Sequence, residues 1–307
     1  MGGPDSGMGR FWRRWWPVGV LIVVGWAGLA VSNCGGGQGE AGDAASVAPT
    51  EPVYGVTLDD ISGLPEILDA LGRLSRRATA RVVFDETVLP AYYREAVVAI
   101  ARVSKVMGEI LDSQFVSTVT VDGYLQRSAD YLAALGDVVD IWEVGNEING
   151  EWLGATPDVV AKMTGAYDLV KAAGKTTALT LYYNQDCWSD PANEMFRWVQ
   201  ANVPERMLQG LDYALISYYE DDCNGLQPDW PAVFAQLATI FPNSRIGFGE
   251  VGTADPARKA DYVTRYYSMA ISEPRYVGGY FWWYFRQDMV PWTQPLWNTL
   301  NTTISTQ

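Results

Sequence analysis

The strongest constraint on the fold is an alternation of short apolar segments with amphipathic segments, which runs from residue 53 almost to the end of the chain. The apolar segments are rich in β-branched and aromatic residues, as buried strands of parallel sheets are. We expect strands over residues 53–58, 80–84, 115–121, 138–144, 177–183, 213–219, 245–251 and 278–285. Most segments between them carry apolar residues at helical spacing, and the clearest helix is expected over residues 91–111.

Strand–helix alternation repeated about eight times over roughly 250 residues is typical of an α/β fold of the (β/α)8 TIM barrel type. A doubly wound open sheet is the alternative. No G-x-G-x-x-G motif follows the first expected strand, as it would in a dinucleotide-binding sheet. We therefore predict a single (β/α)8 catalytic domain over residues 53–307.

The N-terminal residues have the pattern of an export signal. Residues 10–16 are basic and aromatic, and the apolar core at 17–32 is shorter than the roughly 20 residues of a spanning helix. The following "VSNC" resembles the bacterial lipoprotein cleavage box, in which the cysteine, here Cys34, is lipidated and becomes the new N-terminus. An uncleaved signal anchor is the alternative.

This pattern predicts the location of the protein. Residues 1–33 would be the signal, and residues 34–52, rich in Gly, Ala and Pro, a flexible tether. We expect an exported bacterial lipoprotein, held at the cell surface or the periplasmic face of a membrane by the lipid on Cys34.

Composition excludes several classes of function. The formal net charge of −14 argues against nucleic acid as a partner, because phosphate binding requires a basic face. The chain contains no histidine, so Ser-His-Asp and Cys-His nucleophile systems and His-ligated zinc are all ruled out. Acid–base chemistry must therefore fall mainly to carboxylates, Tyr, Lys or Cys.

Two further cysteines, Cys187 and Cys223, each follow a predicted strand. Export to an oxidising compartment permits a disulfide. We predict a bond between these two residues; two unpaired thiols are the alternative.

Two glutamates stand at the ends of predicted strands. Asn146 and Glu147 end the fourth strand in "WEVGNE", and Glu250 ends the seventh in "IGFGEVG". Function in such barrels gathers at the C-terminal ends of the strands, so both carboxyls should face one mouth.

These motifs resemble the signatures of the retaining glycoside hydrolases of clan A, which are (β/α)8 barrels, and the resemblance covers about residues 52–300. It implies that Glu147 is the general acid/base and Glu250 the nucleophile. It implies no metal or organic cofactor. The Asn-Glu pair could instead only cap the next helix, since Asn is a good cap.

The resemblance also implies supporting roles in substrate binding. Asn146 would bind the sugar 2-hydroxyl, and Arg81 would steady the nucleophile. The alternative for Arg81 is a plain ion pair inside the barrel, and Glu143 could belong to the same structural cluster.

Aromatic residues near two other strand ends match further positions of the family. Tyr219 (or Tyr218) would hydrogen-bond to the nucleophile, and Trp283 (or Trp282) would form the floor of the reactive subsite. Trp and Tyr at these positions could also be mostly core.

The sequence thus predicts a retaining O-glycosidase that acts on an oligo- or polysaccharide, with β-linkages expected. One alternative is a non-catalytic carbohydrate-binding lipoprotein on a glycosidase-like barrel, and another is a transglycosylase that uses the same two glutamates. An unrelated barrel enzyme such as an aldolase would need a lysine at a strand end, and we find none.

Overall fold

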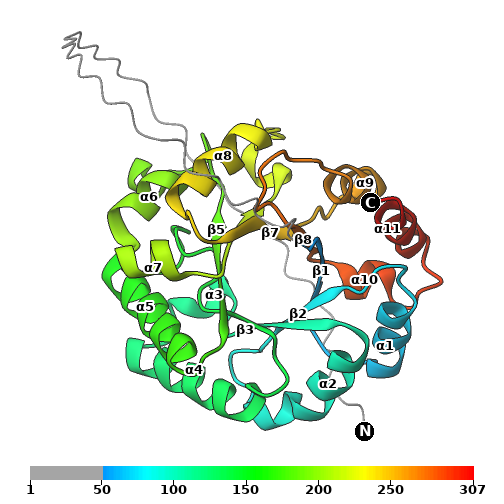
Figure 1. The fold of residues 1–307 in the computed structure, drawn as a ribbon, viewed down its shortest axis with the longest axis horizontal. Helices are drawn as coiled ribbons and strands as arrows, with labels where there is room; N and C mark the ends of the chain where they lie inside the picture. The colour runs from blue at the N-terminus through cyan, green and yellow to red at the C-terminus, as the bar shows by residue number, and fades with distance from the viewer. Residues whose placement is uncertain (1–50) are drawn as a thin grey trace, which may run out of the picture. The chain divides into compact units, whose positions relative to one another are not determined.

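The computed structural model describes residues 51–307, which contain a closed barrel of eight parallel strands in chain order. Figure 1 shows the strands surrounded by a ring of helices. The strands are β1 (Val53–Leu58), β2 (Thr79–Val83), β3 (Lys105–Glu109), β4 (Ile141–Glu143), β5 (Thr176–Tyr182), β6 (Tyr213–Tyr218), β7 (Arg245–Val251) and β8 (Gly278–Trp282). The prediction of a (β/α)8 TIM barrel is confirmed. The predicted signal, tether and lipidated Cys34 lie outside the described residues, apart from positions 51 and 52.

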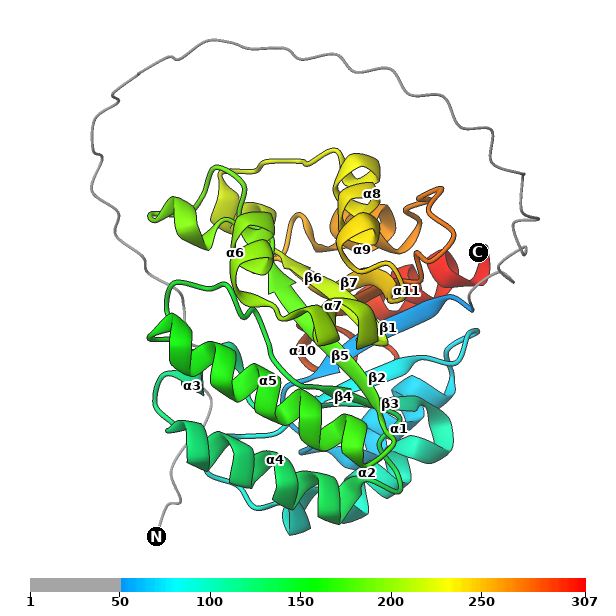
Figure 2. The same cartoon turned by 60° about the vertical axis from the view of Figure 1, so that its left-hand side comes forward.

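The helices cover the outside of the barrel, and α4 and α5 pack side by side along it (Figure 2). They are α1 (Leu64–Gly72), α2 (Pro90–Val103), α3 (Ser113–Val116), α4 (Val121–Leu135), α5 (Thr156–Ala172), α6 (Met195–Asn202), α7 (Glu205–Gly210), α8 (Trp230–Ile240), α9 (Lys259–Tyr267), α10 (Phe285–Met289) and α11 (Pro295–Ser305), with short 3-10 turns η1 (Pro191–Asn193) and η2 (Glu220–Cys223). None of the helices in this part of the chain is both long and apolar enough to cross a membrane.

The barrel interior has an apolar layer below a polar layer. The apolar layer is a separate cluster of buried side chains, formed by Met107, Ile141, Ala178, Leu215 and Phe281. Side chains alternate between the two faces of a strand, so the residue two positions further along points inward again. On β3, β4, β5 and β6 this next inward residue is polar, and the four residues are Glu109, Glu143, Thr180 and Ser217.

The third strand lies in a different place from the one predicted. β3 is Lys105–Glu109, and residues 115–121 instead form the end of α3, a connection and the first residue of α4. The predicted helix over 91–111 ends at Val103, because Ser104 is extended, with φ −138°. The helix was predicted too long because Val106, which lies on β3, continues the helical spacing of the apolar residues of α2.

The predicted disulfide is present. Cys187 and Cys223 are bonded, with their Cα atoms 5.3 Å apart. The bond joins the connection that follows β5 to the turn η2 that follows β6, at the mouth of the barrel.

Candidate active site

The centre of the polar layer is Arg81 on β2, whose side chain is fully buried. Its Nε lies 2.7 Å from Oε2 of Glu143, and its Nη2 lies 3.1 Å from Oε2 of Glu109. Its Nη1 lies 3.0 Å from Oε2 of Glu250. Arg81 therefore belongs to an ion-pair cluster inside the barrel and also contacts Glu250, so its position fits both interpretations that the sequence left open.

Glu250 points into the barrel because of an irregularity in β7. Ile216 pairs with Phe248 and Ser217 with Glu250, so two residues of β7 stand opposite one residue of β6, as in a β-bulge. Phe248 packs outward against Trp230 on α8. In a regular strand Glu250, two residues after Phe248, would share the outward face of Phe248, and the bulge at Gly249 turns it inward.

Tyr219 supplies the second contact to Glu250. Its hydroxyl donates a hydrogen bond of 2.6 Å to Oε1 of the carboxylate. Burial raises the pKa of Glu250 to about 7, although the Arg81 charge and the Tyr219 hydroxyl act to lower it. Tyr218 instead donates to the Leu226 carbonyl and is buried in the core.

Glu147 lies just beyond β4, with a backbone φ of 48°, a strained conformation for a residue other than glycine. Its Oε2 accepts a hydrogen bond of 2.7 Å from Ser113, and its Oε1 accepts one of 2.7 Å from Ser217. Since Ser217 is the strand partner of Glu250, the two glutamates are neighbours in the same mouth. Burial, followed by the Glu250 charge, raises the pKa of Glu147 to about 8.

Asn146 is held from both ends of its amide. Its Oδ1 accepts a hydrogen bond of 2.9 Å from the Ser113 backbone N–H, and its Nδ2 lies 3.4 Å from Oε1 of Glu143. The helix-cap alternative for the Asn-Glu pair is wrong, because α5 begins at Thr156 and its cap is Ala155.

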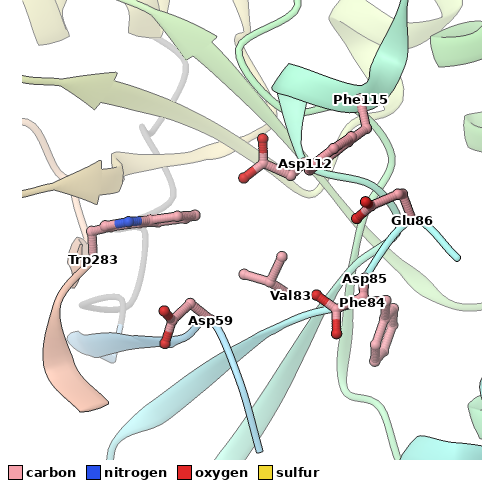
Figure 3. A pocket seen from close by; sticks show the side chains of 8 residues that line it. All are labelled: Asp59, Val83, Phe84, Asp85, Glu86, Asp112, Phe115 and Trp283. Carbon is pink, nitrogen blue, oxygen red and sulfur yellow. The ribbon is translucent and has the colours of Figure 1, made fainter. Parts of the chain in front are cut away.

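A pocket of about 100 Å³ opens at the same end of the barrel, where Trp283 lies across from Asp112 and Phe115 (Figure 3). The remaining lining residues are Asp59, Val83, Phe84, Asp85 and Glu86. The Arg81 guanidinium carbon lies 5.7 Å from the centre of the Trp283 ring, which connects this pocket to the carboxyl cluster. Trp282 faces away, is fully buried and donates to Asp288.

Four residues of this site were missed in the sequence, namely Glu109, Asp112, Ser113 and Ser217. The first three were missed because the third strand was predicted in the wrong place, and its true C-terminal end is Glu109. The acid that ends "KVMGE" was the available signal. Ser217 was missed because a serine within a buried strand carries no distinctive pattern. Within residues 51–307, no cluster of three or more acidic or cysteine side chains could hold a metal ion.

Comparison with known proteins supports the fold. No family model matches the chain, and no curated protein matches it either. Among solved structures, Saccharomyces cerevisiae Gas2p with a bound compound superposes with a TM-score of 0.57 at 13% sequence identity, over 85% of this chain and 65% of that one. The same yeast protein in complex with laminaripentaose gives 0.55 at 13% identity, over 83% and 65%.

A β-glucosidase superposes less well, with a TM-score of 0.48 at 15% identity, over 72% of this chain and 76% of that one. The alignment with each of the two yeast structures covers just under two thirds of the length of that structure. At these identities the likeness concerns the fold alone, a (β/α)8 barrel.

Proposed function

We propose that the protein is a retaining glycoside hydrolase that cleaves β-linked oligo- or polysaccharides, with Glu147 as general acid/base and Glu250 as nucleophile. One observation carries this proposal: two buried carboxyls share the barrel mouth in unlike surroundings. Glu250 lies beside a guanidinium and a phenol, which favour its ionised form. Within the part of the chain that the structure describes, Glu147 accepts hydrogen bonds from two neutral hydroxyls and pairs with no cation, so it keeps its proton more readily than Glu250 does.

The proposed reaction has two displacements. In the first, Glu250 attacks the anomeric carbon, the bond to the leaving oxygen breaks, and Glu147 gives that oxygen its proton. In the second, Glu147 takes a proton from water, the water oxygen bonds to the anomeric carbon, and the bond to Glu250 breaks. Arg81 and Tyr219 stabilise the Glu250 carboxylate that leaves in this step.

The pocket favours a neutral glycan. Four of its lining residues are acidic and none is basic, so a glycan with many carboxylates or sulfates would be repelled. Trp283 offers an apolar face suited to stacking on a sugar ring. Because the yeast structure holds laminaripentaose, a neutral glucan oligosaccharide of that kind is the first substrate to test.

The test is incubation of the purified full chain with laminarin oligosaccharides and a panel of other neutral β-glycans, with Glu250→Gln as the control. New reducing ends that form with the wild type alone support hydrolysis, and retention of anomeric configuration supports the double displacement. Products longer than the substrate would indicate transfer to a sugar acceptor, which uses the same two glutamates. Binding without any product would favour a carbohydrate-binding protein.

We also propose that the protein is exported and held at a membrane by a lipid on Cys34. The basic flank, the short apolar core and the cleavage-box motif support this proposal. Metabolic labelling with a radioactive fatty acid tests it. We expect label in the wild type and none in Cys34→Ala, and equal labelling of both would contradict the assignment.

A further inference from the structure

Two serine hydroxyls hold the carboxyl group of Glu147 between them. Ser113 is the first residue of α3 and bonds to Oε2, whereas Ser217 lies on β6 and bonds to Oε1. Both serines are almost fully buried, at 2% and 0% exposure. Water therefore does not compete for these two hydrogen bonds.

The two serines differ in what else they contact. The Trp152 indole Nε1–H donates a hydrogen bond of 3.1 Å to the Ser113 hydroxyl oxygen. An indole N–H can only donate, so the Ser113 oxygen accepts from it and its own hydrogen is directed at Glu147. Among residues 51–307, the hydroxyl of Ser217 has Glu147 as its single hydrogen-bond partner.

We propose that Ser113 and Trp152 are positioning residues that determine which oxygen of Glu147 carries the transferable proton, so that Oε1 holds it and Oε2 remains the hydrogen-bond acceptor. Chains of hydrogen bonds polarise one another, and a hydroxyl that accepts from an N–H is a better donor. Oε2 is therefore the less basic oxygen. The role of this proton in catalysis rests on the proposed function; its position on the carboxyl group does not.

Ser217 has a different part in this arrangement. When Glu147 is ionised, the Ser217 hydroxyl donates to Oε1. When Oε1 is protonated, the hydroxyl can rotate and accept the hydrogen bond, because no second partner fixes its direction. Ser217 therefore serves both protonation states, whereas Ser113 favours the ionised state, since a hydrogen bond to a carboxylate is stronger than one to a neutral carbonyl oxygen.

Several titratable groups from different elements face Glu147. Glu250 on β7 and Asp112 before α3 both raise its pKa, and the two serines lower it. Tyr219, at the end of β6, also interacts with the Glu147 charge. None of the proposed substitutions changes these charged groups.

The proposal predicts an ordered set of effects. Ser113→Ala removes a donor to the carboxylate, so the pKa of Glu147 rises, by about half a pH unit to one pH unit. Trp152→Phe keeps the ring but removes the N–H, so the pKa rises by less. Ser217→Ala also removes a donor to the carboxylate, but the protonated form loses a hydrogen bond as well, so the pKa should rise by less than in Ser113→Ala. Ser113→Thr restores the hydroxyl and should restore the wild-type value.

The experiment is a pH titration of the full chain labelled with [5-13C]glutamate, in which the Glu147 carboxyl signal is assigned by its loss in Glu147→Gln. The pH profile of kcat/KM on a neutral β-glucan oligosaccharide is measured in parallel, and its alkaline limb should move with the titration. Equal shifts for Ser113→Ala and Ser217→Ala would overturn the proposal, as would no shift in both Ser113→Ala and Trp152→Phe. If the wild type cleaves nothing, the proposed function fails, and the titration alone still tests whether Ser113 and Trp152 favour the ionised carboxylate more than Ser217 does.

Discussion

Arg81 Nη1 lies 3.0 Å from Glu250 Oε2, and the same guanidinium lies within ion-pair distance of Glu143 and Glu109. One cation therefore faces three carboxyls in a buried layer, and three negative charges there would be under-compensated. Glu143 also accepts hydrogen bonds from Thr180 and from Arg81 Nε, so its carboxylate is the best-satisfied acceptor of the three. Neither oxygen of Glu109 meets hydrogen-bond geometry with any described residue. Burial raises the pKa of Glu109 well above its ordinary value, which favours the protonated form of this carboxyl.

This assignment predicts that Glu109→Gln is mild and that Glu143→Gln is not. Glutamine resembles a protonated glutamic acid, so the free energy of unfolding should change by about 1 kcal/mol or less at position 109. At position 143 the same substitution removes the carboxylate that accepts hydrogen bonds from Arg81 and Thr180, and we expect a loss of about 3 kcal/mol or more. Urea unfolding of both variants at pH 7 measures the difference. Equal losses would show that Glu109 is ionised as well.

Removal of the cation should destabilise the protein in a pH-dependent way. In Arg81→Met the three carboxyls lose their shared partner, and we expect a loss of about 3–5 kcal/mol at pH 8. The loss should be smaller at pH 5, because protonation of Glu250, whose pKa is raised to about 7, reduces the repulsion among the carboxyls. The matched control is Arg206→Met, because Arg206 pairs with Asp168 at the surface, with side chains 51% and 53% exposed. We expect little change in that control, and a pH-independent loss in Arg81→Met would contradict the argument.

The two proposed catalytic carboxyls predict a narrow, bell-shaped pH dependence of kcat/KM. The reaction needs Glu250 ionised and Glu147 protonated. The pKa of Glu250 is raised to about 7 and that of Glu147 to about 8, so activity should rise through the first value and fall through the second. The two apparent values belong to the pair, because the sites interact. Initial rates at low substrate concentration across pH 5–10 check this, and a single limb would exclude the paired roles.

The raised pKa of Glu147 also predicts that this residue destabilises the fold at alkaline pH. The pKa of Glu147 is raised in the folded state from its ordinary value of 4.5 to about 8, so the native state binds more protons than the unfolded state in this range. The free energy of unfolding therefore falls as the pH rises through that window. Glu147→Gln should abolish activity and stabilise the protein by about 1–2 kcal/mol at pH 8.5. Thermal unfolding at pH 4.5 and pH 8.5 measures this, and the gain should be absent at the lower pH.

The sequence was sufficient to predict the fold class. One strand of eight was misplaced, but the repeated alternation of strands and helices still indicated a (β/α)8 barrel. The sequence was also sufficient to bring Glu147 and Glu250 to one end of the barrel, since β7 was predicted with its true bounds and β4 lies within the predicted range 138–144, with Glu147 just beyond it. It could not reveal Glu109, because the alternation of β3 was hidden inside the apolar period of α2. It could not predict the inward orientation of Glu250 either, since regular alternation from Phe248 directs that side chain toward the helices.

That orientation depends on Gly249, the extra residue of β7. A Cβ at this position would lie 2.8 Å from Thr180 Oγ1 and 2.9 Å from Leu215 Cβ. The neighbours cannot move freely, because Leu215 belongs to the inner apolar layer and Thr180 donates to Glu143. Gly249→Ala must therefore shift β7 or displace Thr180, and both changes disturb the contact between Glu250 and Arg81.

We expect Gly249→Ala to destabilise the protein by about 1–3 kcal/mol, as overpacking of a core does, and to lower kcat/KM by at least about tenfold. The matched control is Gly72→Ala at the end of α1, where a Cβ would lie 3.6 Å from Val103 Cγ1, an ordinary contact. Alanine favours the helix, so this control should be neutral or slightly stabilising. If Gly249→Ala unfolds at the same urea concentration as the wild type and keeps its activity, the bulge does not hold Glu250 in place. A variant that is destabilised but fully active would show that the bulge supports the barrel and not the orientation of the nucleophile.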